Sequence, residues 1–306
     1  MVASSRNTLN RTDIEFVAGD ELRVERVSVT EPQGARCHHY HDYYELYYLY
    51  SGDRYYFIKD NTYRVKSGSL VLIKPYDMHS TGKVASSGYD RCLVYFHKSF
   101  VKDFLEGAGC ASLLSCFVGG GSIMTFEAEE REGIERLLGM MLEEFEKKRS
   151  GYLQFIKASL IQLLLLIARY TDSGVVKTGN FDYFNSTHKT VSEVAAYINN
   201  NYSEDITLAS ISEKFFISPC YFSRIFKKVT GFSFIEYLNG VRVKEAQRLL
   251  AKTDKSIADI GEEVGYKSNT HFGRAFKASV GTSPAAYRRR VAKQNKIDAK
   301  RKPGFV

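Results

Sequence analysis

The sequence has little cysteine, and the few cysteines it has follow no spacing rule. They form an odd, scattered set at Cys37, Cys92, Cys110, Cys116 and Cys220. An odd set without a repeated spacing argues against a disulfide framework and against a zinc knot. We therefore expect a protein of the reducing cytoplasm.

Long hydrophobic runs are also missing. The N-terminus, Met1–Arg11, is polar and shows no secretory signal. The longest apolar run, Leu160–Ala168, is interrupted by Gln162 and falls far short of the roughly 20 residues that span a bilayer. We expect no membrane partner.

What the chain does have is an ordinary apolar content and an uneven distribution of charge. Its 306 residues suggest about two domains, and 44% hydrophobic residues let each domain bury a core. From Lys189 to the end there are 21 Lys and Arg against 11 Asp and Glu, whereas the preceding residues hold 22 against 24. The last third thus carries all the excess positive charge, which fits nucleic acid as a partner, although a merely soluble basic domain has the same balance.

The N-terminal part has the pattern of short β-strands. From residue 14 to about residue 100, runs rich in Tyr, Val, Phe and Ile alternate with Gly and Asp. The clearest runs are Tyr43–Tyr50, Tyr55–Lys59, Leu70–Ile73 and Arg91–Phe96. Closely spaced short strands predict a sandwich or barrel, which we place at residues 1–120.

A helical periodicity begins after Gly121 and defines an arm at residues 121–170. Apolar residues recur at helical spacing over 134–145, and from Leu153 to Ile167 they step by 3, 4, 3 and 4 residues, a two-heptad seam. The second helix packs on its own barrel alone, or, because Leu164–Leu166 widen its apolar stripe, also on a second copy; we expect a homodimer. Residues 171–187 are dense in Gly, Ser, Thr and Asn and predict a linker. The capping box Thr190-x-x-Glu193 predicts the start of the next helix.

The C-terminal part contains an internal repeat. Phe222-Ser-Arg224-Ile-Phe226-Lys227 recurs fifty residues later as Phe272-Gly-Arg274-Ala-Phe276-Lys277. Upstream, Leu208-Ala209-Ser-Ile211 matches Ile257-Ala258-Asp-Ile260 at an offset of 49, so the second copy holds one extra residue in its turn. Each copy therefore predicts the same supersecondary unit.

That unit is a helix, a short turn and a second helix. In the first copy Thr207 and Ser218 are the N-caps, and Pro219 occupies the first helical position. The second copy opens with Ser256 and Asp259, turns at Val264-Gly265-Tyr266, where Gly can be left-handed, and continues from Ser268. Between the copies, the capping box Ser233-x-x-Glu236 opens a longer helix that holds the two units at a fixed separation.

A helix-turn-helix places its second helix in the major groove of DNA. The positions off the buried phenylalanine face are Cys220, Ser223, Arg224 and Lys227 in the first copy, and Asn269, Thr270, Gly273, Arg274 and Lys277 in the second. Arg pairs with guanine and Asn with adenine, whereas Lys suits phosphates. A lone Arg is usually a surface charge, but twin arginines at matching places favour DNA contact.

Residues 190–290 resemble the AraC/XylS family of transcription regulators. The resemblance is carried by Val264-Gly265-Tyr266, then Phe272-x-Arg274-x-Phe276-Lys277-x-x-x-Gly281-x-Ser283-Pro284-x-x-Tyr287-Arg288. The family implies two recognition helices about one helical turn apart on one face of DNA. It implies a DNA-binding domain at residues 188–292 followed by a basic tail at 293–306, and RNA polymerase as a partner if the protein is an activator.

A second polar cluster lies in the N-terminal part. It reads His39-x-His41-x-x-x-Glu45 and later Pro75-x-Asp77-x-His79. On one strand His39, His41, Tyr43 and Glu45 would share a face. With His79 from another strand, three imidazoles and a carboxylate suit Zn, Fe, Mn or Ni. The alternative is a set of pocket-lining groups that hold an effector by hydrogen bonds, and the dense tyrosines nearby suit a sugar, although Tyr is also a good strand former.

This cluster resembles the cupin barrel, which AraC-type regulators often carry as a sensor domain. It departs from the cupin pattern because Gly34 stands one residue too close to His39, Asp77 replaces a Gly, and the spacing to His79 is one shorter. In such regulators these histidines often line a pocket without binding metal. We therefore expect an effector pocket of His39, His41, Tyr43, Glu45 and His79 and no required cofactor. A divalent metal on His39, His41, Glu45 and His79 is the alternative.

The expected fold class is multidomain β + α, with an N-terminal cupin-like β-barrel, a helical arm and a C-terminal all-α tandem helix-turn-helix domain. The expected function is a sequence-specific DNA-binding transcription regulator that senses a small molecule, a sugar or related metabolite, and is not an enzyme. A cupin metalloenzyme with an incidental basic tail explains neither the repeat nor the charge asymmetry. A third possibility is a metal sensor, in which a metal bound in the N-terminal part changes the DNA affinity of the C-terminal part.

Overall fold

The computed structural model describes residues 4–8, 11–19, 21–30, 38–39, 41–83, 88–105, 113–117, 123–173, 177–178 and 186–300. The chain divides into two compact units, Met1–Lys189 and Thr190–Val306. The first unit is mainly β and the second is α-helical, so the predicted fold class is confirmed.

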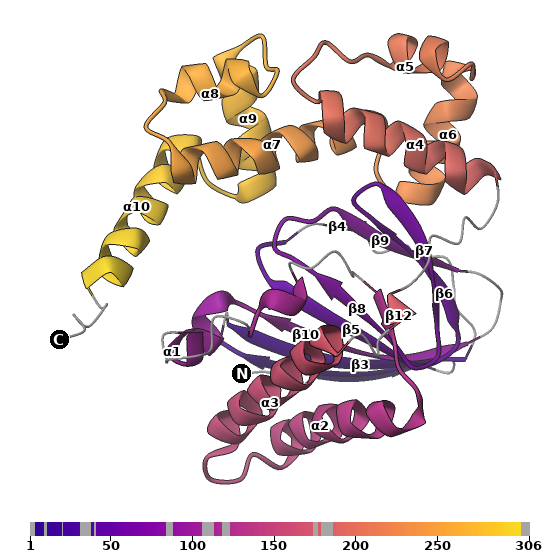
Figure 1. Ribbon diagram of the computed structural model, residues 1–306, viewed down its shortest axis with the longest axis vertical. Helices are drawn as coiled ribbons and strands as arrows, with labels where there is room; N and C mark the ends of the chain where they lie inside the picture. Colours follow the sequence, from indigo (N-terminus) through magenta and orange to yellow (C-terminus); the bar gives the residue numbers. More distant parts are fainter. Residues whose placement is uncertain are drawn as a thin grey trace. The chain divides into compact units, whose positions relative to one another are not determined.

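Two antiparallel sheets build the first unit (Figure 1). The larger sheet has the order β1-β2-β3-β10-β5-β8-β11-β12 and the smaller one β4-β9-β6-β7. The strands are β1 Ser4–Thr8, β2 Arg11–Ala18, β3 Leu22–Val29, β4 His38–His39, β5 Tyr44–Ser51, β6 Asp53–Ile58, β7 Asn61–Lys66, β8 Ser69–Ile73, β9 His79–Lys83, β10 Tyr89–Phe96, β11 Ile123–Thr125 and β12 Lys177–Thr178. The four runs singled out in the sequence are β5, β6, β8 and β10, and strand structure starts at Ser4, earlier than predicted.

The two faces of the larger sheet serve different cores, because successive side chains on a strand point to opposite faces. One face carries Leu46, Tyr48 and Cys92 and packs on helices. The other carries Tyr47, Leu49 and Leu93 and packs against residues of the smaller sheet such as Tyr56 and Val65. This second face is the interior of the barrel.

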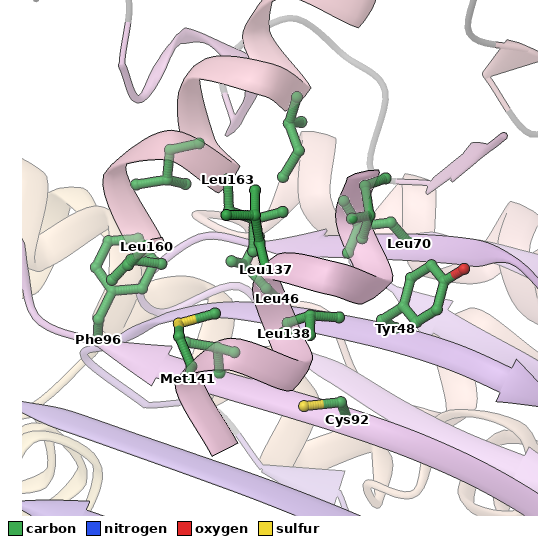
Figure 2. Packing of buried hydrophobic residues seen from close by; sticks show 14 of the residues in the cluster. Leu46, Tyr48, Leu70, Cys92, Phe96, Leu137, Leu138, Met141, Leu160 and Leu163 are labelled. Carbon is green, nitrogen blue, oxygen red and sulfur yellow. The ribbon is translucent and has the colours of Figure 1, made fainter. Parts of the chain in front are cut away.

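The helices α2 (Ala128–Lys147) and α3 (Tyr152–Asp172) cover the outer face of the larger sheet. Figure 2 shows Leu137, Met141, Leu160 and Leu163 packed with Leu46 and its strand neighbours. Among the shorter helical segments, η1 Lys98–Val101 adds Val101 and η3 Ser115–Phe117 adds Cys116 and Phe117 to the same core, and α1 Lys102–Leu105 packs its Leu105 against it.

The apolar seam of α3 is used inside the chain. Ile156, Leu160, Leu163 and Ile167 are all fully buried in the core that α3 shares with α2 and the sheet. The structure therefore shows the helix packed on its own barrel, and this seam is not available to a second copy. In the described part of the chain, α3 is the one helix long and apolar enough to cross a membrane, but its apolar side chains are occupied by this packing.

The connection between the units departs from the sequence prediction at its second end. Helix α4 runs from Ser186 to Asn201, so Thr190 lies one turn inside it and the predicted capping box at Thr190 is wrong. Residues 186–189 include no Gly or Pro that would stop the helix from extending upstream. Most of the predicted linker, at 174–176 and 179–185, lies outside the described residues.

The second unit contains α5 (Leu208–Lys214), α6 (Pro219–Thr230), α7 (Phe234–Lys252), α8 (Ile257–Glu263), α9 (Asn269–Val280) and α10 (Pro284–Lys300). All five N-caps predicted for α5 to α9 are confirmed: Thr207, Ser218, Ser233, Ser256 and Ser268 each accept a hydrogen bond from a backbone N–H. The predicted basic tail begins within α10, which continues to Lys300.

Candidate nucleic-acid interface and barrel site

The first helix-turn-helix consists of α5 and α6. Phe222, Ile225 and Phe226 are buried on α6, and the rings of Phe222 and Phe226 lie 5.1 Å apart. This packing fixes which side of α6 faces outward. The outward residues are those predicted from the sequence, since Cys220, Ser223, Arg224 and Lys227 are all exposed.

The second helix-turn-helix, α8 and α9, repeats this arrangement. Phe272 and Phe276 are fully buried on α9, which leaves Asn269, Thr270, Arg274 and Lys277 exposed and Gly273 half-buried. The two recognition helices thus present polar and cationic side chains at matching positions, the arrangement that groove reading requires.

Helix α7 packs against both helix-turn-helix motifs. Near its start, Phe234 and Tyr237 pack on Phe222 and Phe226 of α6, with ring centroids 6.1 Å and 5.3 Å apart. Its second half contributes Val243, Ala246, Leu249 and Leu250 to the core around Phe272 and Phe276. The hydrophobic cores at both ends of α7 hold it in place.

A polar clasp around Arg242 adds a second connection. Arg242 on α7 is 8% exposed. Its Nε donates to the carbonyl of Tyr202 at 2.7 Å, and its Nη2 donates to the carbonyl of Glu204 at 2.8 Å. Its Cζ lies 5.4 Å from the centroid of Tyr266, in the turn of the second helix-turn-helix. Arg242 thus ties the segment between α4 and α5 to the turn between α8 and α9.

Gly265 completes the clasp. It has a φ of +91°, and a Cβ added there would lie 2.7 Å from the carbonyl oxygen of Ser203. Beside it, Lys267 pairs with Asp205 at 2.5 Å. Glycine is therefore required in this turn both for its left-handed backbone and for the close approach of residue 203.

Sequence reasoning missed two exposed residues of the first unit. Tyr221 is 40% exposed, and the Cζ of Arg224 lies 5.7 Å from its ring centroid; its spacing three residues before Arg224 was the available signal. Phe216, in the turn, is 95% exposed and has a φ of +53°. Nothing in its residue type announces a left-handed conformation, which favours Gly.

The barrel site brings together three of the predicted pocket residues. The Nε2 of His41 lies 2.9 Å from Glu45 Oε2, and the Nε2 of His79 lies 3.2 Å from the same oxygen. Each histidine also turns Nδ1 toward a backbone carbonyl: His41 toward Tyr43 at 3.2 Å and His79 toward Asp77 at 2.8 Å. The ligating atoms of His41, Glu45 and His79 lie within 4.8 Å of one another.

Burial and charge act in opposite directions on this site. Burial by itself would raise the pKa of Glu45, but the charges and hydrogen bonds of His79 and His41 hold it well below its ordinary value. Burial would lower the pKa of His79, but Glu45 raises it. The site therefore stabilises a carboxylate between two imidazoles.

The remaining predicted residues lie close by, but not on one strand. β4 ends at His39 and β5 begins at Tyr44, so the prediction that residues 39–45 form one continuous strand is wrong. The ring of Tyr43 lies 5.6 Å from that of His41. The backbone of His39 pairs with His79 across β4 and β9, and its side chain is outside the described residues.

Two further tyrosines join this site. The hydroxyl of Tyr56 donates to Glu45 Oε1 at 3.3 Å, and the ring of Tyr95 stands edge-on to His41 at 5.5 Å. Tyr56 comes from β6, the strand after β5, and Tyr95 from β10; the tyrosine-rich composition was the one signal for them. Buried and half-buried imidazole, phenol and carboxylate groups together suit hydrogen bonding to a small polar ligand.

Comparison with known proteins places each unit. Residues 21–164 match the family model described as an AraC-like ligand binding domain, and residues 211–290 match the model of a helix-turn-helix domain. The HTH-type transcriptional regulator YdiP of Escherichia coli is 28% identical over 92% of this chain and 90% of its own length. The HTH-type transcriptional activator RhaS of Pectobacterium carotovorum is 25% identical over 89% and 96%.

Solved structures include similar chains. The C-terminal domain of AraT, a response regulator from Geobacillus stearothermophilus, is 39% identical over 34% of this chain and 88% of that one, with a TM-score of 0.33. ToxT from Vibrio cholerae is 14% identical over 88% and 97%, with a TM-score of 0.37. With an N-terminal ligand-binding domain and a C-terminal helix-turn-helix DNA-binding domain in one polypeptide, the chain belongs to the AraC family of transcription regulators.

Proposed function

We propose that this regulator reads two adjacent major-groove segments with α6 and α9 and that a small molecule in the barrel controls it. The observation that carries the proposal is the matched pair of exposed arginines, Arg224 and Arg274, on two recognition helices that share the scaffold helix α7. Cys220, Ser223, Asn269 and Thr270 contact bases beside them. Lys227 and Lys277 contact phosphates.

Single substitutions at the two arginines test this reading. After selection of a high-affinity site from random duplexes, Arg224→Ala and Arg274→Ala should each weaken binding by about 1–3 kcal/mol and relax base preference at one position. Arg248→Ala is the control, because Arg248 is an exposed arginine on α7 that pairs with Glu245. Unchanged affinity and footprints for both variants would remove the arginines from base readout.

The effector, in this proposal, binds in the barrel interior beside His41, Glu45, His79 and Tyr43. The support is the set of polar groups that the structure brings together there from separate strands. Thermal-shift measurements on the full chain against sugars, other metabolites and divalent metals identify the class. The compound that raises the melting temperature should also change the affinity for the selected DNA, since an effector acts only through different affinities for two states.

We further propose a homodimer that acts in the cytoplasm. Since the seam of α3 is buried, the contact surface is the outer side of that helix, where Phe155 is 44% exposed. The free thiols of Cys92 and Cys116, which are buried, and of Cys220 suit a reducing compartment. Phe155→Glu should shift the mass measured by light scattering from dimer to monomer, whereas Gln154→Glu should leave it unchanged; the same mass for wild type and Phe155→Glu counts against this surface.

RNA polymerase is the proposed protein partner, and activation the proposed outcome. The support is the similar chain RhaS, which is named a transcriptional activator. Transcription from a template carrying the selected site, with purified polymerase, should rise when the regulator is added. A fall in transcript would identify a repressor.

A metal sensor is the second candidate, because two imidazole nitrogens and a carboxylate oxygen lie within 4.8 Å of one another, a donor set that Zn²⁺ accepts. Zinc should then bind the wild type and not His41→Ala, and should change DNA affinity in the wild type alone. Zinc binding without an effect on DNA would leave the site structural. Metal-dependent turnover without salt-sensitive DNA binding would instead indicate the metalloenzyme.

A further inference from the structure

A second polar cluster in the barrel interior is built from residues other than the histidine site. Directly opposed residues of antiparallel strands share a face. Arg54 on β6 shares its face with Tyr56, two residues along the strand, and Tyr56 packs on Tyr47 of the larger sheet at 4.9 Å. Arg91 on β10 lies opposite Leu49, an interior residue. Two guanidinium groups therefore occupy the interior.

The two arginines differ in how their charge is balanced. Arg91 Nη2 pairs with Glu25 at 3.2 Å, and Glu25 is also paired with Arg23 at 2.7 Å. Arg54 is 7% exposed, and its Nη2 donates to Thr81 Oγ1 at 3.5 Å. In the described ranges no carboxylate pairs with Arg54. A buried cation without a counter-charge is costly.

Both arginines flank the same ring. The Cζ of Arg54 lies 4.3 Å from the centroid of Tyr89 and the Cζ of Arg91 lies 5.9 Å from it. The Nε of each arginine and the hydroxyl of Tyr47 are buried and make no hydrogen bond within the described part of the chain. Three unused donors and one unbalanced positive charge thus surround Tyr89.

We propose that Arg54, Arg91 and Tyr47 form an oxyanion subsite, which binds a small metabolite through a carboxylate or phosphate group. Guanidinium groups are the preferred partners of both oxyanions, because their N–H donors match the spacing of two oxygens. The inference rests on the proposed role of the barrel as the effector domain, and it adds the chemical class of the effector. The anionic group occupies the Tyr89 end, while the histidine cluster contacts the neutral part.

The first test needs no ligand. Arg54→Met removes the unbalanced charge but keeps most of the side-chain volume, so it should leave the melting temperature of the ligand-free full chain unchanged or raise it. Arg64→Met, which breaks an exposed pair with Asp53, is the matched control on the neighbouring strand. A fall of several degrees for Arg54→Met alone would mean that Arg54 is a structural group and would overturn the proposal.

The second test compares probes that differ at one carbon: glucose, glucuronate and glucose 6-phosphate, with inorganic phosphate alongside, all at constant ionic strength. The anionic probes should raise the melting temperature of the wild type, and glucuronate and glucose 6-phosphate compare a carboxylate with a phosphate. This rise in melting temperature should be lost in Arg54→Met and kept in Arg64→Met. Equal probe-induced shifts in melting temperature for wild type and Arg54→Met at every probe concentration would refute the subsite. DNA affinity of the same variants, measured without probe, shows separately whether the DNA-binding function is intact.

Discussion

The two turns of the repeat have different residues at the equivalent position, although both residues adopt a left-handed backbone conformation. Phe216 and Gly265 both have positive φ, +53° and +91°. The N–H of the residue that follows donates in each case to the carbonyl five residues earlier, Ile217 to Ser212 and Tyr266 to Gly261. Only the second turn has the residue that the conformation favours. The first turn therefore stores strain at a side chain that is almost fully exposed.

Phe216→Gly should stabilise the protein by about 1 kcal/mol, because relief of left-handed strain exceeds the added freedom of the unfolded chain. Urea unfolding measures it. Phe216→Ala keeps the strain and should change little, and Gly265→Ala should destabilise by about 1–3 kcal/mol, since its Cβ meets Ser203. A less stable Phe216→Gly would show that the ring itself contributes to the fold.

Individual residues also show which features of the structure the sequence predicts and which it does not. The N-caps were predictable because a cap and its N–H partner lie within three residues. The exposed face of α6 and α9 was predictable from helical spacing. The absence of a carboxylate partner for Arg54 among the described residues was not predictable, because the neighbours of an interior arginine depend on strands that pair only in the folded barrel.

At the scale of the elements, the relative placement of α6 and α9 depends on α7 and on the Arg242 clasp. Arg242 joins the segment 202–204 to α7 by two hydrogen bonds to carbonyl groups, and its guanidinium group lies over the ring of Tyr266 in the second turn. If the clasp were lost, α7 alone would set the separation of the recognition helices. The preference for one spacing between the two DNA segments is then the property most sensitive to loss of the clasp.

Arg242→Met should therefore weaken binding to the selected site and, more specifically, reduce discrimination against sites with one base pair inserted or removed between the two segments. Competition binding on the three duplexes measures the ratio, and circular dichroism checks the fold. Arg248→Met on the same helix should keep the wild-type ratio. A uniform loss on all three duplexes would mean that the clasp affects stability and not spacing.

Element boundaries show a second limit of sequence reading. Periodicity located the main strands to within about two residues and identified α2 and α3, although α2 begins six residues before the first periodic residue and α3 ends five residues after the last. The predicted start of α4 and the continuous strand through residues 39–45 were wrong. Alternation assigns a face only while a strand is unbroken, so it did not show that His41 reaches Glu45 from outside β5. His79 required the pairing of β9 with β4 and β6.

For the whole molecule, the charge asymmetry of the sequence has a measurable consequence. The excess positive charge resides after Lys189, and Lys227 and Lys277 are exposed on the recognition helices. Each phosphate contact releases counterions, so the logarithm of the binding constant should fall linearly with the logarithm of the salt concentration.

Lys227→Ala and Lys277→Ala should each reduce that slope by about 1 and weaken binding almost equally for all sequences. Fluorescence anisotropy across a salt series measures both quantities. Lys66→Ala, an exposed lysine on β7 in the other unit, should leave the slope unchanged. An unaltered slope for both recognition-helix variants would place the phosphate contacts elsewhere.

Helix α7 contributes apolar side chains to both helix-turn-helix cores. Neither core can open without exposing one end of this shared helix, so the two should unfold as one cooperative segment. Amide hydrogen exchange should then show the same opening free energy in α6 and α9. A DNA fragment that offers one groove segment alone should slow exchange in the recognition helix that it does not touch.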